Sequence, residues 1–463
     1  MPSTFLFIAG TVLLSLNFVR LAGLAISDWF YFGAMTLALI ETARFDRGNF
    51  QCWTRNRFLW LAGLILLGAI ISTSRAIFIN AAIVEIFQQL YVITLFISLI
   101  WIMVRRGKTD MIVQAFIWSG VFTASLAAID YFAGTNLGPQ LSGTPHVQFW
   151  GRYAGSLGHP NKFGYYLVLT TILSIAKFME ISLNDTRLAI RVNWNLLILI
   201  QLFGVYLSGS MTAYLGFLLG SLALTVCSKT LTRQIVRYAI SVLLIGVPIL
   251  LFGTIFFNMS PPDNVSLENT LISTAFNRVG TSTAYSRWYI FQQALQNIGT
   301  SPIVGAGYDQ VSTSGIGADF RQLNGTVHNL FLQSWYVGGI FVFLGWLFIY
   351  VNLGWMAVTI TRTQTPKGTA PVLLGIAAAA LSIMLMDQFQ DAVYQREKWL
   401  VLGLLAAWYW TRISEYQGRL SLPRARSLWN SPAAVDNAHM LATSHPRWLS
   451  ENRKGESVHE PSS

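Results

Sequence analysis

The sequence predicts an all-α integral membrane protein of about 12 transmembrane helices, with a long extracytoplasmic loop before the tenth. Three observations support this fold class. Hydrophobic residues make up 53% of the 463-residue chain and charged residues only 11%, which is too little charge for a soluble surface of this size. Apolar stretches recur at the length that a helix needs to cross a bilayer. Lysines and arginines gather in short runs between these stretches.

The individual helices follow from the apolar stretches in chain order. They are predicted at residues 3–19, 22–40, 58–74, 82–104, 110–133, 162–179, 194–209, 211–227, 238–258, 329–352, 370–387 and 397–411. No small-residue cleavage site follows the first stretch, so we interpret it as a retained helix and not as a signal peptide. Only Ser208-Gly209-Ser210 separates the seventh stretch from the eighth, which predicts a tight helical hairpin.

The basic residues predict that both termini lie in the cytoplasm. In this orientation 22 of the 31 lysines and arginines fall in inside segments, and the bias persists without the C-terminal tail. The net charge of +11 is spread over these loops, so we expect no nucleic-acid partner. Cys52 and Cys227 lie near predicted cytoplasmic ends, and we expect no disulfide framework.

The helices and loops divide the chain into four parts. Residues 1–133 form the N-terminal helices, 134–352 a central core, 353–411 the C-terminal helices, and 412–463 a polar cytoplasmic tail that we expect to be disordered.

Two segments of the core, 134–161 and 259–327, are long and are predicted to lie outside. The second contains an amphipathic helix from Ser286 to Ile298, whose spacing predicts an apolar face of Trp288, Phe291, Ala294 and Leu295. A turn-rich loop, "TSPIVGAGYDQ", follows this helix.

The segments predicted outside contain an unusual set of cationic and titratable residues. These are Arg152, His159, Arg278, Arg287, Arg321 and His328. The guanidinium group of arginine makes two-point contacts with phosphate oxygens. Histidine can accept a proton from a sugar hydroxyl near neutral pH. Together these groups would suit the transfer of a sugar from a lipid diphosphate.

Each residue also has a structural interpretation. His328, next to Asn329, would then cap a helix or lie among lipid headgroups, and Arg287 would bind lipid phosphates without specificity. Arg152 would be an interfacial anchor. In "GSLGHPNKFG", Pro160 suits a helix start and Asn161 a cap, so His159 would occupy a turn. The outer segments have no carboxylate pair or zinc pattern with metal-ligand spacing, and we expect neither a metal nor a cofactor. The "GAG" at Gly305–Gly307 is too short a signal for a nucleotide loop.

Four stretches taken together resemble the O-antigen ligase and polymerase superfamily, which are bacterial membrane glycosyltransferases of the GT-C type. They are "GRYAGSLGHPNKFGYYLVL", "YLSGSMTAYLGFLLG", "YSRWYIFQQALQNIGTSPIVGAGYDQ" and "VHNLFLQSWYVGGIFVFLGWL". The resemblance covers roughly Arg152 to Tyr350. Its specific part is the Arg-Trp helix, then Pro-x-x-Gly-x-Gly, then His-Asn at a helix start.

The resemblance implies an inverting enzyme that takes a glycan from undecaprenyl diphosphate on the outer face without a metal or a nucleotide sugar. The acceptor is lipid A–core in ligases and another lipid-linked repeat unit in polymerases; a chain-length regulator is a further candidate partner. The family's essential histidine corresponds to His328, its periplasmic-loop arginine to Arg287, and its earlier arginine to Arg152. His159, Asn161 and Asn329 are secondary candidates, and Arg278 and Arg321 are further candidate diphosphate ligands.

Two departures from the family pattern bear on the activity. Met211 stands where the family often has an arginine after a Ser-x-Ser turn, so that diphosphate contact would be either missing or supplied by Arg278 or Arg321. In many ligases of the family, the His-Asn pair is followed by nine residues, a Gly, two further residues and then a Gly, Thr or Tyr. Val342 stands at that last position, which favours a polymerase or exopolysaccharide enzyme over a lipid A ligase.

Two other classes of protein remain as alternatives. A transporter or flippase would also have about 12 helices, but it should show two similar halves and charged residues near mid-membrane. The sequence shows no repeat between its halves. A structural membrane subunit would not need Arg287 and His328 together.

Overall fold

The computed structural model describes residues 1–16, 20–21, 24–45, 56–142, 152–184, 188–227, 281–308, 327–362, 371–390 and 395–421. The chain forms two units, Met1–Tyr409 and Trp410–Ser463. In the described residues the only strands are β1 (Arg20–Leu21) and β2 (Leu24–Ala25), which pair antiparallel. The all-α fold class predicted from the composition is therefore confirmed.

The helices of the first half lie between residues 2 and 142. They are α1 (Pro2–Val12), the 3₁₀ turn η1 (Leu13–Leu16), α2 (Ile26–Phe45), α4 (Phe58–Thr73), α5 (Ile79–Leu90), the π-helical η2 (Tyr91–Phe96), α6 (Ile97–Arg105), α7 (Thr109–Ala133) and α8 (Leu137–Ser142).

The helices of the second half lie between residues 155 and 421. They are the 3₁₀ turn η3 (Gly155–Leu157), α9 (Pro160–Asn184), α10 (Leu188–Ser208), α11 (Met211–Cys227), α14 (Thr281–Thr300), α16 (Leu330–Arg362), α17 (Pro371–Met386) and α18 (Arg396–Ser421).

Eleven of the predicted apolar stretches coincide with these helices, and the stretch at 238–258 lies outside the described residues. Among the described helices, five are long and apolar enough to cross a membrane: 79–105, 109–133, 160–182, 189–208 and 330–360. Shorter apolar helices occur at 2–16, 58–73, 211–226 and 371–386. Residues 412–421, which we assigned to the tail, continue α18, because a helix need not end where its apolar stretch ends.

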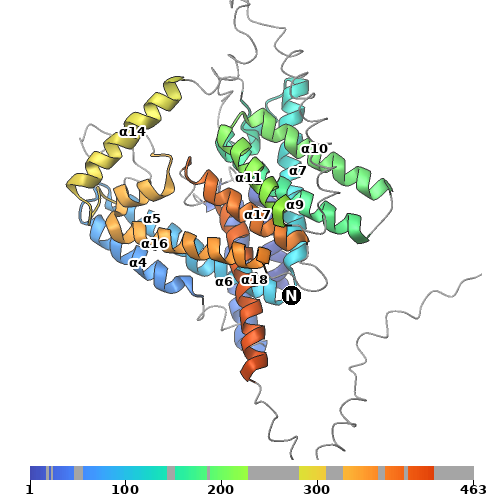
Figure 1. Cartoon of the computed structure of the whole chain (residues 1–463), viewed down its shortest axis with the longest axis horizontal. Helices are drawn as coiled ribbons and strands as arrows, with labels where there is room; N and C mark the ends of the chain where they lie inside the picture. Colours follow the sequence, from blue (N-terminus) through green and yellow to red (C-terminus); the bar gives the residue numbers. More distant parts are fainter. Residues whose placement is uncertain are drawn as a thin grey trace, which may run out of the picture. The chain divides into compact units, whose positions relative to one another are not determined.

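Helix α9 is the central element of the first unit. Every residue from Phe163 to Lys177 is buried, and α7, α10, α11 and α17 pack against this helix (Figure 1). The predicted tight connection between α10 and α11 is present, with α10 ending at Ser208 and α11 beginning at Met211. The two helices do not pack along their lengths as a hairpin, however. Both pack on α9, α10 also on α7, and α11 also on α17.

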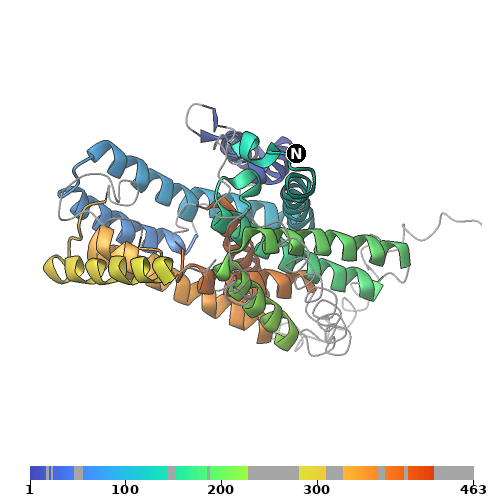
Figure 2. The same cartoon turned by 90° about the horizontal axis from the view of Figure 1, so that it is seen from above.

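Helix α16 packs against α4 and also carries α14, which lies alongside it in Figure 2. It bends at Gly339, where φ is 70° and ψ is −169°. A Cβ at this position would lie 1.9 Å from the carbonyl oxygen of Ile303, so only glycine fits. At the bend, main-chain N–H and C=O groups of α16 form hydrogen bonds with the loop that follows α14.

Residues 301–307 bind this bend through main-chain hydrogen bonds, and we call them the 301–307 loop. Ala306 N donates to Tyr336 O at 2.8 Å, Gly307 N to Val337 O at 3.3 Å, and Ile340 N to Pro302 O at 3.0 Å. The loop therefore fixes the C-terminal end of α14 to the first part of α16.

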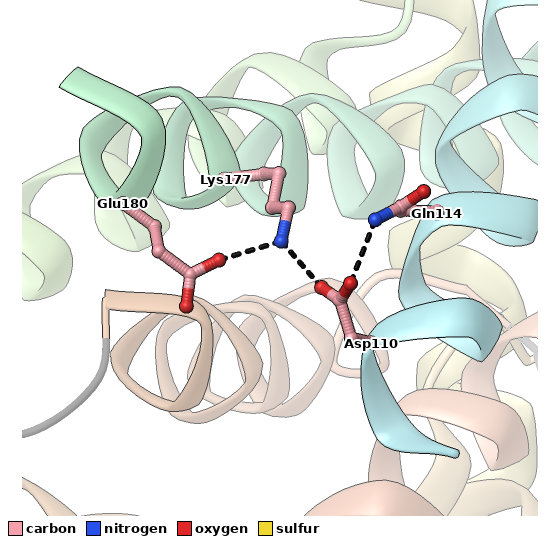
Figure 3. Close-up of polar contacts among 4 residues, drawn as sticks. All are labelled: Asp110, Gln114, Lys177 and Glu180. Carbon is pink, nitrogen blue, oxygen red and sulfur yellow. Dashed lines mark hydrogen bonds and ion pairs between the residues drawn. The ribbon is translucent and has the colours of Figure 1, made fainter. Parts of the chain in front are cut away.

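Polar contacts between segments group toward the two ends of α9. At its N-terminal end, Ser156 Oγ donates to Ser15 O at 2.7 Å and Arg396 pairs with Asp28. At its C-terminal end, Lys177 Nζ lies 2.5 Å from Asp110 Oδ1 and 2.6 Å from Glu180 Oε2 (Figure 3). Of these residues, Ser156 and Arg396 belong to segments that we predicted outside, and Lys177 and Glu180 belong to a segment that we predicted inside. Which end faces the cytoplasm stays a prediction.

Candidate functional site

Arg152 lies against the turn between α10 and α11. Its Nε donates to Ser208 O at 2.8 Å, and Tyr153 N donates to Leu207 O at 2.9 Å. Gly209 has a φ of 54°, and a Cβ there would lie 3.0 Å from Arg152 Cγ, so the turn is shaped to accept this side chain. Burial raises the pKa of Tyr153, and the carboxylate of Asp130 adds to the shift.

The guanidinium of Arg152 also reaches the start of α9, where Nη2 donates to Asn161 Oδ1 at 2.5 Å. Pro160 begins the helix as predicted. The capping residue is His159, however, whose Nδ1 accepts from Asn161 N at 3.1 Å. Because a main-chain N–H can only donate, Nδ1 is the acceptor, and a neutral ring carries its proton on Nε2. The side chain of Asn161 is thereby directed to Arg152 and not to the cap.

His328 lies one residue before the cap of α16. Asn329 is the cap, since its Oδ1 accepts from Leu332 N at 2.9 Å. His328 has a φ of 50° and is the only described non-glycine residue with a positive φ. A left-handed backbone at a histidine persists only where the surroundings hold it, and such positions cluster at functional sites. The side chain is half-buried.

Residues 387–390, here called the 387–390 turn, contact both of these segments. Leu330 N donates to Asp387 O at 2.9 Å, and Asn329 Nδ2 donates to Gln388 O at 3.2 Å. Gln390 Nε2 donates to Asn161 O at 3.4 Å. The structure thus joins the Arg152–Asn161 segment and the His328–Asn329 segment, which lie far apart in the sequence, through a third segment that the sequence analysis did not single out.

A fully buried ion pair lies beneath the 387–390 turn. Lys398 Nζ is 2.8 Å from Asp387 Oδ2, and both side chains are 0% exposed. Tyr165 donates to Asp387 Oδ1 at 3.0 Å, and Tyr350 donates to Oδ2. Sequence reasoning missed this pair. The available signal was a charged residue beside the end of each of two apolar helices, since membrane proteins rarely bury ionisable side chains without a function.

The remaining candidates are only partly described. Arg287 belongs to α14, whose presence confirms the predicted helix, although it begins five residues earlier than Ser286, at Thr281. The buried face of α14 contains Ala294 and Ile298, whereas Leu295, which we placed on that face, is 46% exposed. Arg278 and Arg321 lie outside the described residues. Among the described residues, no group of three His, Cys, Asp or Glu side chains could hold a metal ion.

Comparison with known proteins identifies a family for the central part of the chain. Residues 196–347 match the family model described as O-antigen ligase. No curated protein matches the chain. The matched segment includes the turn at Ser208, helix α14 and His328. Arg152 and Asn161 lie before it and Asp387 and Lys398 after it, and the fold attaches both groups to the matched segment.

Proposed function

We propose, from the match of residues 196–347 to the O-antigen ligase family model, that the chain is a membrane glycosyltransferase of the O-antigen ligase and polymerase superfamily. It transfers or polymerises an oligosaccharide carried on undecaprenyl diphosphate, at the extracytoplasmic face, during synthesis of O-antigen, capsule or exopolysaccharide. The observation that carries the proposal is that the family match spans α14, which contains Arg287, and His328, which lies just before α16.

In the proposed reaction, a hydroxyl oxygen of the acceptor attacks the anomeric carbon of the donor. The new glycosidic bond forms as the bond from that carbon to the diphosphate oxygen breaks, which inverts the configuration. His328 accepts the hydroxyl proton, a contribution of about 10²–10⁴-fold in rate. Arg287 and Arg152 neutralise the leaving diphosphate, with Arg278 and Arg321 as further ligands.

The position of Arg152 supports its role in holding the diphosphate. Met211, where the family often has an arginine, immediately follows the turn that Arg152 lies against, and its side chain is 49% exposed. Arg152 therefore brings a guanidinium to the same turn from a different part of the chain. We propose that Arg152 supplies the contact that Met211 cannot make.

The protein would lie in a bacterial inner membrane with about 12 helices, both termini in the cytoplasm, and the 259–327 loop outside. Its partners would be the lipid-linked donor, a glycan or lipid-linked glycan acceptor, membrane lipids and a chain-length regulator. A ligase that uses lipid A–core as acceptor is the second candidate, and a polysaccharide flippase the third. Genes for a flippase and a chain-length regulator beside this one would favour the polymerase.

The proposed use of arginines in place of a metal has a direct test. Membranes containing the protein should release undecaprenyl diphosphate and lengthen the glycan at an undiminished rate in excess EDTA, because the arginines neutralise the leaving group. Complete loss of release in EDTA, restored by magnesium or manganese, would show that the arginines are insufficient. A flippase would release no undecaprenyl diphosphate under either condition.

A further inference from the structure

The Asp387–Lys398 ion pair has the features expected of a pair whose role is to fix the geometry of the residues around it. Its two side chains are 0% exposed and 2.8 Å apart. The Lys398 ammonium also lies 5.8, 5.6 and 5.4 Å from the ring centroids of Trp346, Tyr350 and Trp399. Removing two charges from water commonly costs more than their attraction returns, so a buried ion pair is a poor source of stability. Such pairs are better explained by the geometry that they enforce.

The geometry enforced here is that of the 387–390 turn. Asp387 O accepts from Leu330 N at 2.9 Å, Gln388 contacts Asn329, and Gln390 contacts Asn161 O. Through its side chain, Asp387 is also tied to α9 by Tyr165, to α16 by Tyr350 and to α18 by Lys398. One carboxylate therefore links three helices to the turn that contacts both halves of the candidate site.

We infer that the Asp387–Lys398 pair is a positioning element of the proposed transferase, which holds His328 in register with the Arg152–Asn161 segment. The inference rests on the proposed function. His328 needs such support, because its left-handed backbone is not a conformation that a histidine retains unaided. Neither Asp387 nor Lys398 acts on substrate; each acts through the turn.

The test removes both charges together, so that no lone charge stays buried. Asp387→Asn/Lys398→Met keeps the approximate shape of both side chains, and the amide oxygen introduced at position 387 can still accept from Tyr165. The control is Asp110→Asn/Lys177→Met, which removes both charges of the more exposed Asp110–Lys177 pair toward the other end of α9 and leaves the partly exposed Glu180 charged (Figure 3). Purified variants are compared for the unfolding midpoint, kcat, KM and the pH profile of kcat.

We expect both double variants to fold and insert. The Asp387→Asn/Lys398→Met variant should lose on the order of 100-fold in kcat, as misplacement of a reacting group by about 1 Å can cause. Its KM and the shape of its pH profile should stay close to those of the wild type, since the binding groups and His328 remain. The control should keep the wild-type kcat. A kcat equal to that of the control would overturn the inference.

If the double variant does not fold, a second variant tests the positioning role of the Asp387–Lys398 pair. Tyr350→Phe removes one hydroxyl from Asp387 and keeps the ring next to Lys398. We expect it to fold and to lower kcat with little change in KM, and an unchanged kcat would overturn the inference. Glycan transfer by the wild-type protein tests the proposed function separately. Transfer by the wild type that is lost in His328→Asn, together with full activity of both double variants, would refute only the positioning role.

Discussion

His328 combines a titratable ring with a left-handed backbone conformation, one residue before the cap of α16. Its neighbour Asn329 supplies the cap, so replacing His328 removes no capping bond. Asparagine tolerates this backbone conformation better than alanine, for which the left-handed region costs about 1–2 kcal/mol. His328→Asn should therefore insert normally and yet nearly abolish glycan transfer, because an amide cannot accept the hydroxyl proton.

Polymer or ligated glycan on a gel, from a deletion strain that carries each variant, measures this effect. Membrane levels of the protein are determined in parallel, and His328→Ala serves as the less tolerated comparison. If His328 were only an interfacial residue, His328→Asn would give wild-type banding. That banding at a normal protein level would end the proposed role of His328.

At the residue scale, the sequence singled out candidate residues but did not predict their contacts. His159 and Asn161 were both candidates, but the pattern assigned the cap to Asn161, since asparagine is the commoner capping residue. Only the fold shows that Arg152 engages the Asn161 side chain. Asp387 and Lys398 were missed because their pairing depends on how the end of α17 and the start of α18 meet in the fold, which local spacing does not reveal.

At the scale of elements, the 301–307 loop binds the bend in α16 and so connects α14, which contains Arg287, to the helix that follows His328. Gly339→Ala should break this connection, because the new Cβ would lie 1.9 Å from Ile303 O and the left-handed φ is unfavourable to alanine. We expect a loss on the order of 3 kcal/mol in the free energy of unfolding and a loss of transfer.

Gly354→Ala, in the same helix, is the matched control for this substitution. Its Cβ would meet only Met384 Sδ at 3.6 Å and Cε at 3.8 Å, an ordinary contact distance. It should leave transfer intact and raise stability by up to about 1 kcal/mol, the difference in helix propensity. Thermal unfolding in detergent measures the stability of the Gly339→Ala and Gly354→Ala variants. Equal unfolding midpoints for the two variants would show that the bend does not hold the 301–307 loop.

Apolar length was sufficient to predict eleven of the helices that the structure describes, because a span needs a set number of apolar residues. It was not sufficient to predict their packing. Helices α10 and α11 diverge from a tight turn, since each gains more contact from α9 than from the other. The bend at Gly339 likewise depends on a loop much earlier in the chain, at Ile303.

At the scale of the whole molecule, the distribution of lysines and arginines predicts which face carries the site. A cysteine introduced at Gly315, after replacement of Cys52 and Cys227, should react with a membrane-impermeant maleimide in intact cells. A cysteine at Gln364 should react only after permeabilisation. The reverse pattern would place the 259–327 loop in the cytoplasm, away from an extracytoplasmic donor.

The central claim is that the chain transfers a glycan from a lipid diphosphate, and purified protein in liposomes tests it most directly. The liposomes contain the undecaprenyl diphosphate-linked glycan and its acceptor, and free undecaprenyl diphosphate is quantified together with glycan length. We predict that the wild type releases undecaprenyl diphosphate in proportion to the bonds formed and that His328→Asn releases almost none. Movement of the intact donor across the bilayer, with no release by the wild type, would contradict the account and identify a flippase.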